Sequence, residues 1–323
     1  MKRTILVASV MLCAALPGVQ AWASSESEAG QAMTVAVGHS EAIEPAQAGE
    51  EAAKKAKDAL KDKIPDVVFV FDCVGGGPEG KQAMLDAVAR HFPAEKIYGC
   101  SAYNAITPTG SAGTVGVLAL AGVRVDAALS NLDGGHEACG KRIGEALKPA
   151  AEKNKDRGQL LVLIGDCHFP INQKLVDGVL GVLGEQFPVS GGAANGGLTY
   201  AQGKVHTKSN VGVLISGHFT CGFAIKKAET TEPMDVVNQA GLAFKQAVGD
   251  RTDKLQMVFA FDCGGRRGQM KDKRPIEVDQ MNEAAGKAPI FGFYGSGETG
   301  RDGNAAPAKG VGYHICVAAI FKK

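Results

Sequence analysis

The sequence lacks any cluster of positive charge and, after its first residues, any long apolar segment. Its 323 residues carry 35 Lys and Arg against 34 Asp and Glu, which gives a formal net charge of +1. Proteins that bind nucleic acid or anionic membrane surfaces present basic patches, so neither partner is expected. No later apolar run approaches the roughly 20 residues that a membrane-spanning helix needs, and we expect no membrane span.

Several signatures of catalytic, metal and cofactor sites are also missing. The sequence contains no C-x-x-C pair and no G-x-S-x-G nucleophile motif. The stretch GGGPEG (75–80) matches the G-x-G-x-x-G pattern of dinucleotide sites, but no acidic residue ends the following strand and Pro78 interrupts the motif. We interpret its glycines as turn residues, and the sequence predicts no cofactor.

The first 23 residues have the composition of a secretory signal peptide. Lys2 and Arg3 precede an apolar run (5–16), and the small-x-small pattern AWA (21–23) follows it. We therefore expect cleavage after Ala23 and an exported protein, either periplasmic or extracellular. The mature chain would hold 35 − 2 = 33 basic and 34 acidic residues.

The segment after the signal peptide, residues 24–52, is rich in Ser, Glu, Ala, Gln and Gly and lacks apolar periodicity. Such a composition buries too little apolar surface to fold, so it predicts a disordered leader. Export permits disulfides, but most of the seven remaining cysteines are expected to be buried thiols, because a chain of this size does not need stapling.

An internal repeat organises the rest of the chain. Three apolar runs end in the dipeptide Asp-Cys, at Asp72, Asp166 and Asp262, which are 94 and 96 residues apart. The same landmarks surround each dipeptide: an alanine-rich helix before it, a helix after it, and a second strand that runs into glycine. The predicted helices are 50–62, 79–92, 137–153, 171–187, 233–248 and 275–286, and the second strands are 97–101, 188–192 and 290–297.

A Val-Gly motif gives a further landmark, at Gly116, Gly212 and Gly312. The first two motifs run into segments 123–131 and 219–227, each of which we predict to be the hairpin partner of the strand before it. Strand-helix-strand units imply parallel strand pairs and hairpins add antiparallel ones. The predicted fold class is α/β, with mixed sheets flanked by helices and built from three related units of about 95 residues. The three aspartates are expected to superpose.

Glycine-rich motifs give the chain a family resemblance. Residues 65–227 contain YGCSA (98–102), LLVLIGD (160–166) and PVSGGAANGG (188–197), and residues 235–321 contain IFGFYGSGETG (290–300) and a closing KGVGYHICVAAIF. These motifs resemble the N-terminal and C-terminal parts of the FIST (F-box and intracellular signal transduction) domain. The resemblance implies a sensory module that binds small molecules, such as amino acids or related metabolites. It suggests a FIST N-terminal-like domain at 53–230, with two units, and a C-terminal-like domain at 231–323, with the third.

The family pattern favours a Gly-Glu pair after the small-residue turn, which this chain keeps as Gly297 and Glu298. The matching positions in the N-terminal copy are Asn104 and Ala105, so the carboxylate is absent there. The Asp-Cys dipeptides are not part of the family pattern, and no effector domain accompanies the module. A signalling partner is therefore not indicated by the chain itself.

The loop 293–304 concentrates features of a ligand site. Glu298 and Arg301 would suit a zwitterion, with its ammonium on Glu298 and its carboxylate on Arg301; in the alternative interpretation the two side chains only pair with each other in a solvated loop. The matching turns of the other units (100–104 and 191–195) are expected to complete the pocket. The predicted ligand-binding residues are Tyr294, Ser296, Glu298, Arg301, Cys100, Ser101, Asn104, Gly191, Gly192, Asn195, Asp72, Asp166 and Asp262. For the three aspartates, each of which precedes a predicted helix, the favoured alternative is N-capping or a hydrogen bond within the turn.

Two other functions stay open at this stage. A hydrolase or transferase on the same scaffold would use Cys100 or a strand-end serine as nucleophile. A metal or redox protein would use the three Asp-Cys turns, if a pseudo-threefold axis brings Cys73, Cys167 and Cys263 together. Scattered Cys and His residues are more often structural, so the sequence assigns no metal. Metal content and a single reactive thiol would separate these alternatives from a binding protein.

Overall fold

The computed structural model describes residues 18–23, 32–108 and 114–323. The first unit of the fold begins at β2 and ends at β6. Its elements are β2 (Thr34–Ser40), α1 (Pro45–Leu60), β3 (Val67–Asp72), α2 (Gly77–Ala89), η1 (Ala94–Lys96), β4 (Ile97–Ser101), β5 (Asn104–Ile106) and β6 (Val115–Ala121). A separate strand, β1 (Val19–Ala23), precedes it.

The second and third units repeat this order of elements. The second has β7 (Arg124–Asn131), α3 (Gly135–Lys153), β8 (Gly158–Gly165), α4 (Ile171–Leu183), β9 (Val189–Ala193), η2 (Asn195–Gly197), β10 (Thr199–Ala201), β11 (Lys204–His206) and β12 (Ser209–Gly217). The third has β13 (Phe219–Lys226), α5 (Pro233–Val248), η3 (Thr252–Lys254), β14 (Leu255–Cys263), α6 (Gly264–Met270), η4 (Lys271–Lys273), α7 (Arg274–Ala285), β15 (Ile290–Gly295), β16 (Glu298–Gly300), β17 (Lys309–Val311) and β18 (Ile315–Lys322).

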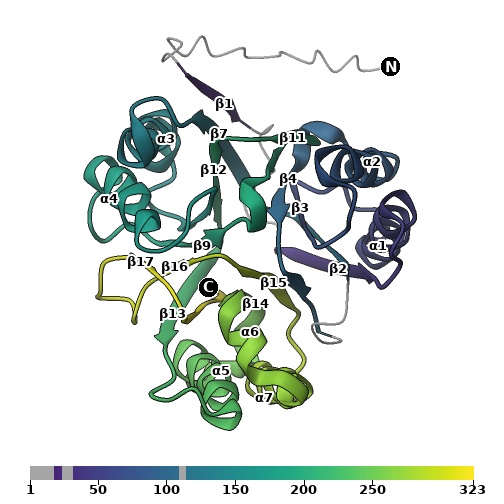
Figure 1. Ribbon diagram of the computed structural model, residues 1–323. Helices are drawn as coiled ribbons and strands as arrows, with labels where there is room; N and C mark the ends of the chain where they lie inside the picture. The colour runs from purple at the N-terminus through teal and green to yellow at the C-terminus, as the bar shows by residue number, and fades with distance from the viewer. Residues whose placement is uncertain (1–17, 24–31, 109–113) are drawn as a thin grey trace.

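Each unit builds a mixed sheet around a parallel pair of strands. The parallel pairs are β3 with β4, β8 with β9, and β14 with β15. The unit's last strand lies antiparallel on the other side and pairs in turn with the unit's first strand. Figure 1 shows the helices of the three units at three corners around the strands. The α/β class, the mixed sheets with flanking helices and the three-unit organisation are confirmed.

A short strand from each unit completes the sheet of another. β5 of the first unit pairs with β15 of the third, β16 of the third pairs with β9 of the second, and β10 of the second pairs with β4 of the first. This cyclic exchange brings the turns after β4, β9 and β15 next to one another. The Tyr103 amide donates to the Tyr294 carbonyl at 2.8 Å, and the Ser296 amide donates to the Ala193 carbonyl at 2.9 Å.

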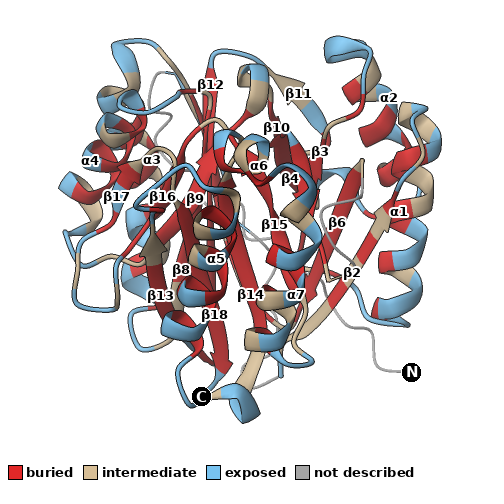
Figure 2. Ribbon diagram, turned by 60° about the horizontal axis from the view of Figure 1, so that its bottom comes forward, coloured by how far each residue is buried: buried red, intermediate tan, exposed pale blue. Residues whose placement is uncertain are grey.

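The core lies where the inner faces of the three sheets meet. Phenylalanines from β3, β14 and β15 interdigitate there, with ring centroids 5.8 Å apart for Phe69 and Phe259 and 4.5 Å apart for Phe71 and Phe293. Three further apolar clusters lie between each sheet and its helices. In Figure 2 the central strands are buried and the exposed residues follow the outer faces of the helices. Strands buried on both faces explain the continuous apolar runs before the Asp-Cys dipeptides.

Glycine fixes one close contact in the parallel pairs. Gly99 and Gly191 both have a φ of +156°, and a Cβ on either would lie only 1.8 Å and 1.9 Å from the carbonyl oxygens of Val70 and Leu163. Any side chain here would collide with the neighbouring strand, so the strand-to-glycine pattern in the sequence has a steric cause.

The disordered leader predicted for residues 24–52 is wrong for its second half, which forms β2 and the first part of α1. Alanine explains the error, because the small residues of α1 give little apolar signal yet lie fully buried against the sheet. Residues 24–31 and the apolar run of the predicted signal peptide lie outside the described residues. Val19–Ala23, at its end, forms β1 and pairs antiparallel with β7.

The two predicted hairpins are also wrong. The segment after β6 is β7, which pairs with β12 and β1, and the segment after β12 is β13, which pairs with β18. Each of these strands begins the next unit, whose last strand lies beside it. The prediction paired strands that are adjacent in the chain, whereas the first strand of each unit pairs with the last strand of the same unit.

Two landmarks of the repeat do not superpose. Asp72 and Asp262 are paired in their parallel ladders, opposite Ser101 and Tyr294, whereas Asp166 follows the last paired residue of β8. The third Val-Gly motif lies at the end of β17 and in the following turn, outside β18, whereas Gly116 and Gly212 lie within β6 and β12.

Candidate functional site

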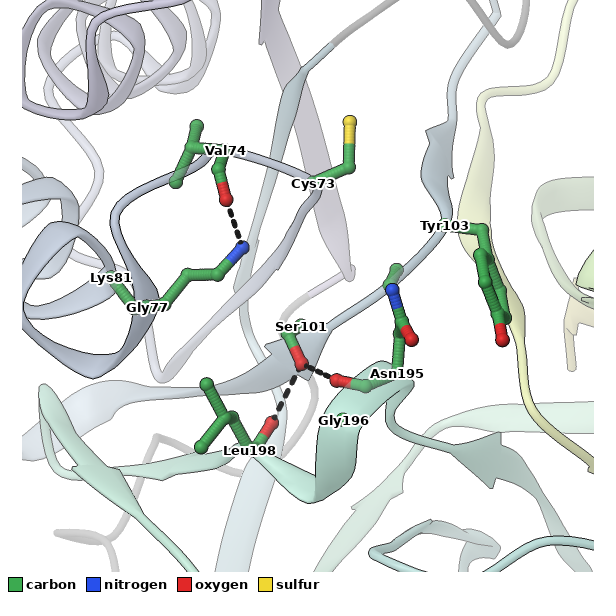
Figure 3. Close-up of a pocket in the computed structure, with 10 residues that line it drawn as sticks. Cys73, Val74, Gly77, Lys81, Ser101, Tyr103, Asn195, Gly196 and Leu198 are labelled. Carbon is green, nitrogen blue, oxygen red and sulfur yellow. Dashed lines mark hydrogen bonds between the residues drawn. The ribbon is translucent and has the colours of Figure 1, made fainter.

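A pocket of about 470 Å³ opens at the carboxyl ends of β3 and β4. In open α/β sheets this edge is where ligands bind, because strand ends and helix N-termini converge there. Its walls come from the first unit and from η2 of the second (Figure 3). The lining residues are Cys73, Val74, Gly77, Lys81, Ser101, Ala102, Tyr103, Asn195, Gly196 and Leu198.

Lys81 supplies the positive charge of the pocket. It lies in α2 and is 6% exposed, and its ammonium forms an ion pair with Asp72 and donates to the Val74 carbonyl at 2.6 Å. The other oxygen of Asp72 accepts from the Tyr200 hydroxyl at 2.5 Å. Burial raises the pKa of Asp72 and the Lys81 charge opposes that rise. An ammonium has three N–H donors, so these two contacts leave one for a ligand.

The N-terminus of α2 forms a second wall of the pocket. Gly76 caps the helix with a φ of +82°, and no side chain accepts from the first amides of the helix. Gly77, the first helical residue, lines the pocket. Backbone amides at a helix N-terminus favour negative charge; Pro78 has no N–H, so Gly77 and Glu79 offer the first amides of α2, and Gly77 lines the pocket together with Lys81.

The opposite wall is polar and comes from β4 and η2. The Ser101 hydroxyl donates to the carbonyl of Asn195 and lies 3.4 Å from that of Leu198 (Figure 3). Tyr103 adds a half-exposed ring, with 43% of its surface accessible. The pocket thus combines a cation, uncapped amides, a hydroxyl, an amide side chain and an aromatic ring.

Of the predicted site residues, Ser101 and Asn195 line this pocket. Asp72 does not line it but forms the ion pair with Lys81, which does. Cys100 points into the core and is fully buried, which raises the pKa of its thiol well above the usual range. That environment is unsuited to a cysteine nucleophile. Asn104 is also buried and accepts from the Cys73 thiol at 3.3 Å.

The glycines predicted from the second unit have packing roles. Gly191 faces the Leu163 carbonyl, as described above. A Cβ on Gly192 would lie 3.0 Å from the Gly297 carbonyl oxygen and from the Phe293 ring. Both glycines are buried in β9, and neither lines the pocket.

The zwitterion site predicted for loop 293–304 is not formed. The Arg301 guanidinium donates to the carbonyls of Ala306, Asn304 and Gln186 and to the Gln186 side chain, at 2.6–3.1 Å. Glu298 is fully buried and accepts from the His314 amide at 3.0 Å. Three residues apart along extended backbone, the two side chains point to opposite sides of the chain.

Tyr294 and Asp262 belong to a closed network in the third unit. Arg266 donates to Asp262 at 2.6 Å and to Glu277 at 3.1 Å, and the Tyr294 hydroxyl donates to Glu277 at 2.6 Å. All four side chains are fully buried. Burial, and then the charge of Asp262, raise the pKa of Glu277 well above its usual value. Ser296 contributes its carbonyl, which lies 3.2 Å from His168 Nδ1.

The third aspartate, Asp166, contacts a histidine. Its Oδ1 lies 3.0 Å from His136 Nε2, and its backbone amide donates to Asn210 at 2.8 Å. The convergence of Cys73, Cys167 and Cys263 is not observed: in the described part of the chain, the group with metal-ligand spacing is His136, Asp166 and Cys167. The seven described cysteines carry free thiols.

Sequence reasoning missed the residues that give the pocket its chemistry. Lys81 directly follows GGGPEG, and a lysine one turn into the helix that a glycine-rich loop opens was a signal for anion binding. Tyr103 lies in the turn 100–104 that was expected to complete the pocket, although it was not singled out, and Tyr200 gave no signal. Tyr200 reaches Asp72 only because β10 pairs with β4 across two units. No helix in the described ranges is both long and apolar enough to cross a membrane.

Known proteins share little sequence with this chain. No curated protein matches the sequence. Two solved structures of cyanuric acid hydrolase are similar at a TM-score of 0.46: one, described as an evolutionary innovation by structural concatenation, shares 13% identity over 90% of this chain and 100% of its own. The other, from A. caulinodans, shares 12% over 88% and 98%. Such similarity does not bear on activity.

Family models match most of the folded part of the chain. The FIST N domain model matches residues 66–240 and the FIST C domain model matches residues 186–301. The N-domain match alone spans more than half of the 323 residues. The chain therefore belongs to the FIST family.

Proposed function

We propose that the protein is an exported small-molecule-binding protein of the sensory type, and that its ligand occupies the pocket at the carboxyl ends of β3 and β4. The observation that carries this proposal is the pocket itself. It has the volume of a small-metabolite site, it lies at the ligand-binding edge of the sheet, and it is lined by several polar groups.

The charge distribution favours a ligand with a carboxylate. The ammonium of Lys81 and the uncapped amides of α2 both attract negative charge. Ser101 and Asn195, on the opposite wall, offer acceptors for an amino group, and Tyr103 offers an apolar ring face. An amino acid or a related metabolite has this combination of groups. In this proposal the carboxylate of the ligand faces Lys81 and its amino group faces Ser101 and Asn195. It replaces the zwitterion site predicted from Glu298 and Arg301.

Binding is tested best with the metabolite that the protein itself retains. Mass spectrometry of gently purified protein identifies co-purified small molecules, and calorimetry then measures their affinity. Replacing Lys81 by Gln removes a charged hydrogen bond worth about 1.5–3 kcal/mol, so affinity should fall roughly 10- to 100-fold.

Lys54→Gln is the matched control, because Lys54 forms an exposed ion pair with Asp58 on α1, away from the pocket lining. It should leave affinity unchanged. Equal affinity of the wild type and Lys81→Gln would place the ligand elsewhere, and co-purified molecules without a carboxylate or another anion would contradict the ligand class.

The export part of the proposal has a structural consequence. Cleavage after Ala23 removes β1, whose five residues pair with β7 from Val19 opposite Ser130 to Ala23 opposite Asp126. Cleavage would thus have to precede this pairing or displace it, and would leave β7 as a sheet edge. N-terminal sequencing of exported protein should begin at Ser24. A chain that is exported and still begins at Met1 would contradict the proposal.

A further inference from the structure

The second unit contains a compact group of three potential metal ligands outside the pocket. His136 lies in the first turn of α3, and Asp166 and Cys167 directly follow β8. One ligand atom from each lies within 4.8 Å of the others, and His136 Nε2 is 3.0 Å from Asp166 Oδ1. The fold brings these residues together across 30 positions of sequence.

A comparison with the other two units shows what this group lacks. The strand-end carboxylate of the first unit pairs with Lys81, and that of the third pairs with Arg266, so each has a permanent cation beside it. In the second unit the partner of Asp166 is an imidazole, which is cationic only when protonated. No lysine or arginine of the described ranges pairs with Asp166. The second unit therefore has a largely buried carboxylate after its central strand, with no permanently charged cation paired to it in the described ranges.

We propose that His136, Asp166 and Cys167 bind a divalent metal ion with the ligand preferences of zinc. Zinc is bound in proteins by imidazole nitrogen, carboxylate oxygen and thiolate sulfur, at about 2.0–2.3 Å. Ligand atoms around one such ion lie roughly 3–4 Å apart, a spacing that small side-chain rotations reach from the observed one. Three protein ligands leave the fourth tetrahedral position for water.

The surroundings of the group suit this role. The side chains of His136 and Asp166 are 19% and 9% exposed, so an ion can reach them while most of the group is shielded. When the ion binds Cys167, the sulfur–metal bond forms and the thiol proton passes to solvent.

Asn210 contacts the backbone of the proposed metal ligands. Its side-chain oxygen accepts from the Asp166 amide at 2.8 Å, and its side-chain nitrogen donates to the Cys139 sulfur at 3.0 Å. Cys139 and Cys167 both belong to the buried cluster between the second sheet and its helices. Outer contacts of this kind orient metal ligands and are worth about 10- to 100-fold in affinity.

The test uses Zn²⁺ and Co²⁺ as probes on the purified full chain. After treatment with a chelator, the protein should bind one Zn²⁺ by calorimetry, and Co²⁺ should give a thiolate-to-metal charge-transfer band and the intense visible bands of four-coordinate cobalt. Cys167→Ser should abolish the charge-transfer band. Asp166→Asn and His136→Gln should each weaken Zn²⁺ binding by at least the roughly 10- to 100-fold expected for an outer contact.

Matched controls come from the same chain. Cys73→Ser changes the thiol of the first Asp-Cys dipeptide, and His218→Ala changes an exposed histidine three residues before Cys221, so both should retain Zn²⁺ binding and the cobalt spectrum. Circular dichroism confirms folding of each variant. Absence of the charge-transfer band in the wild type, or its survival in Cys167→Ser, would overturn the proposal and leave His136 and Asp166 as a structural pair that ties α3 to β8.

Discussion

The strand ends of the first and third units start from the same Asp-Cys dipeptide and reach opposite outcomes. In the first unit Asp72 holds Lys81 at the wall of an open pocket. In the third unit Asp262 holds Arg266, and the guanidinium has a second carboxylate, Glu277, on its other side. The fold therefore fixes the position of the carboxylate in these two units. The cation that pairs with it decides whether a ligand can reach the strand end.

The geometry of the two cations explains the difference. A lysine ammonium is a point charge with three donors, so it can hold Asp72 and still face a cavity. An arginine guanidinium is a planar fork that bridges two acceptors, and here it spans Asp262 and Glu277 with no exposed surface. The insertion of α6 in the third unit brings Arg266 four residues after its aspartate.

The largest expected effect comes from removing the cation of the closed network. Arg266→Met leaves Asp262 and Glu277 buried without their counter-charge, and breaking a buried pair costs about 3–5 kcal/mol. Lys81→Met should cost less, about 1.5–3 kcal/mol, because Asp72 keeps its bonds from Tyr200 and the Val74 amide. Urea denaturation of both variants gives the two free energies of unfolding.

Arg267→Met is the control for this pair, since Arg267 neighbours Arg266 in α6 but only approaches the Tyr294 ring, at 5.7 Å. It should cost no more than about 1 kcal/mol. Equal losses for Arg266→Met and Lys81→Met would mean that the two strand ends do not differ energetically.

Two buried tyrosines allow a finer comparison. Tyr200 donates to Asp72 at 2.5 Å and Tyr294 donates to Glu277 at 2.6 Å, and both side chains are fully buried. Burial raises the pKa of both carboxyls; the Lys81 charge opposes the rise at Asp72, whereas at Glu277 the charge of Asp262 adds to it and outweighs the opposing charge of Arg266. Hydrogen bonds to charged groups are worth more than neutral ones.

Tyr200→Phe should therefore cost about 1.5–3 kcal/mol of unfolding free energy, and Tyr294→Phe about 0.5–1.5 kcal/mol, near neutral pH. Thermal and urea unfolding of the two variants measure the difference. Tyr98→Phe is a suitable reference, because that hydroxyl donates to a main-chain carbonyl, of Glu95, at 3.2 Å. A larger loss of unfolding free energy for Tyr294→Phe than for Tyr200→Phe would mean that Glu277, and not Asp72, accepts the stronger hydrogen bond.

The same comparison shows what sequence reasoning can reach. The three apolar runs, their helices and the α/β class were predictable, because strands buried on both faces and amphipathic helices leave direct patterns. The cyclic exchange of β5, β10 and β16 was not, since each is a three-residue strand whose partner lies in another unit. Without that exchange, nothing in the sequence places Tyr200 beside Asp72 or η2 opposite Lys81.

The candidate site was predictable only in part, for a related reason. Glycine-rich turns with polar residues pointed to Ser101 and Asn195, and both line the pocket. Identical signals at Glu298 and Arg301 proved to be structural, because a charged side chain in a glycine-rich stretch looks the same whether its partner is a ligand or the protein's own backbone. Burial separates the two cases, and burial follows from the tertiary arrangement.

The last expected effect is a pH dependence of stability, which comes from Glu298 at the start of β16 in the third unit. Burial is the largest cause that raises the pKa of Glu298 well above its ordinary value of 4.5. A carboxyl with a raised pKa in the folded state binds its proton more tightly there than in the unfolded state. Its contribution to stability is therefore full below about pH 4.5 and is lost as the pH rises through the folded pKa, at about 1.4 kcal/mol per pH unit. Glu298→Gln removes this pH dependence and keeps the shape of the side chain. The free energy of unfolding of the variant should therefore rise relative to that of the wild type as the pH increases from about 5 to about 8. Glu283→Gln, on the exposed face of α7, should follow the wild-type curve at every pH. Urea unfolding across this range measures both, and a wild type that becomes more stable relative to Glu298→Gln as the pH rises would show that the folded protein holds Glu298 as an ionised, compensated carboxylate.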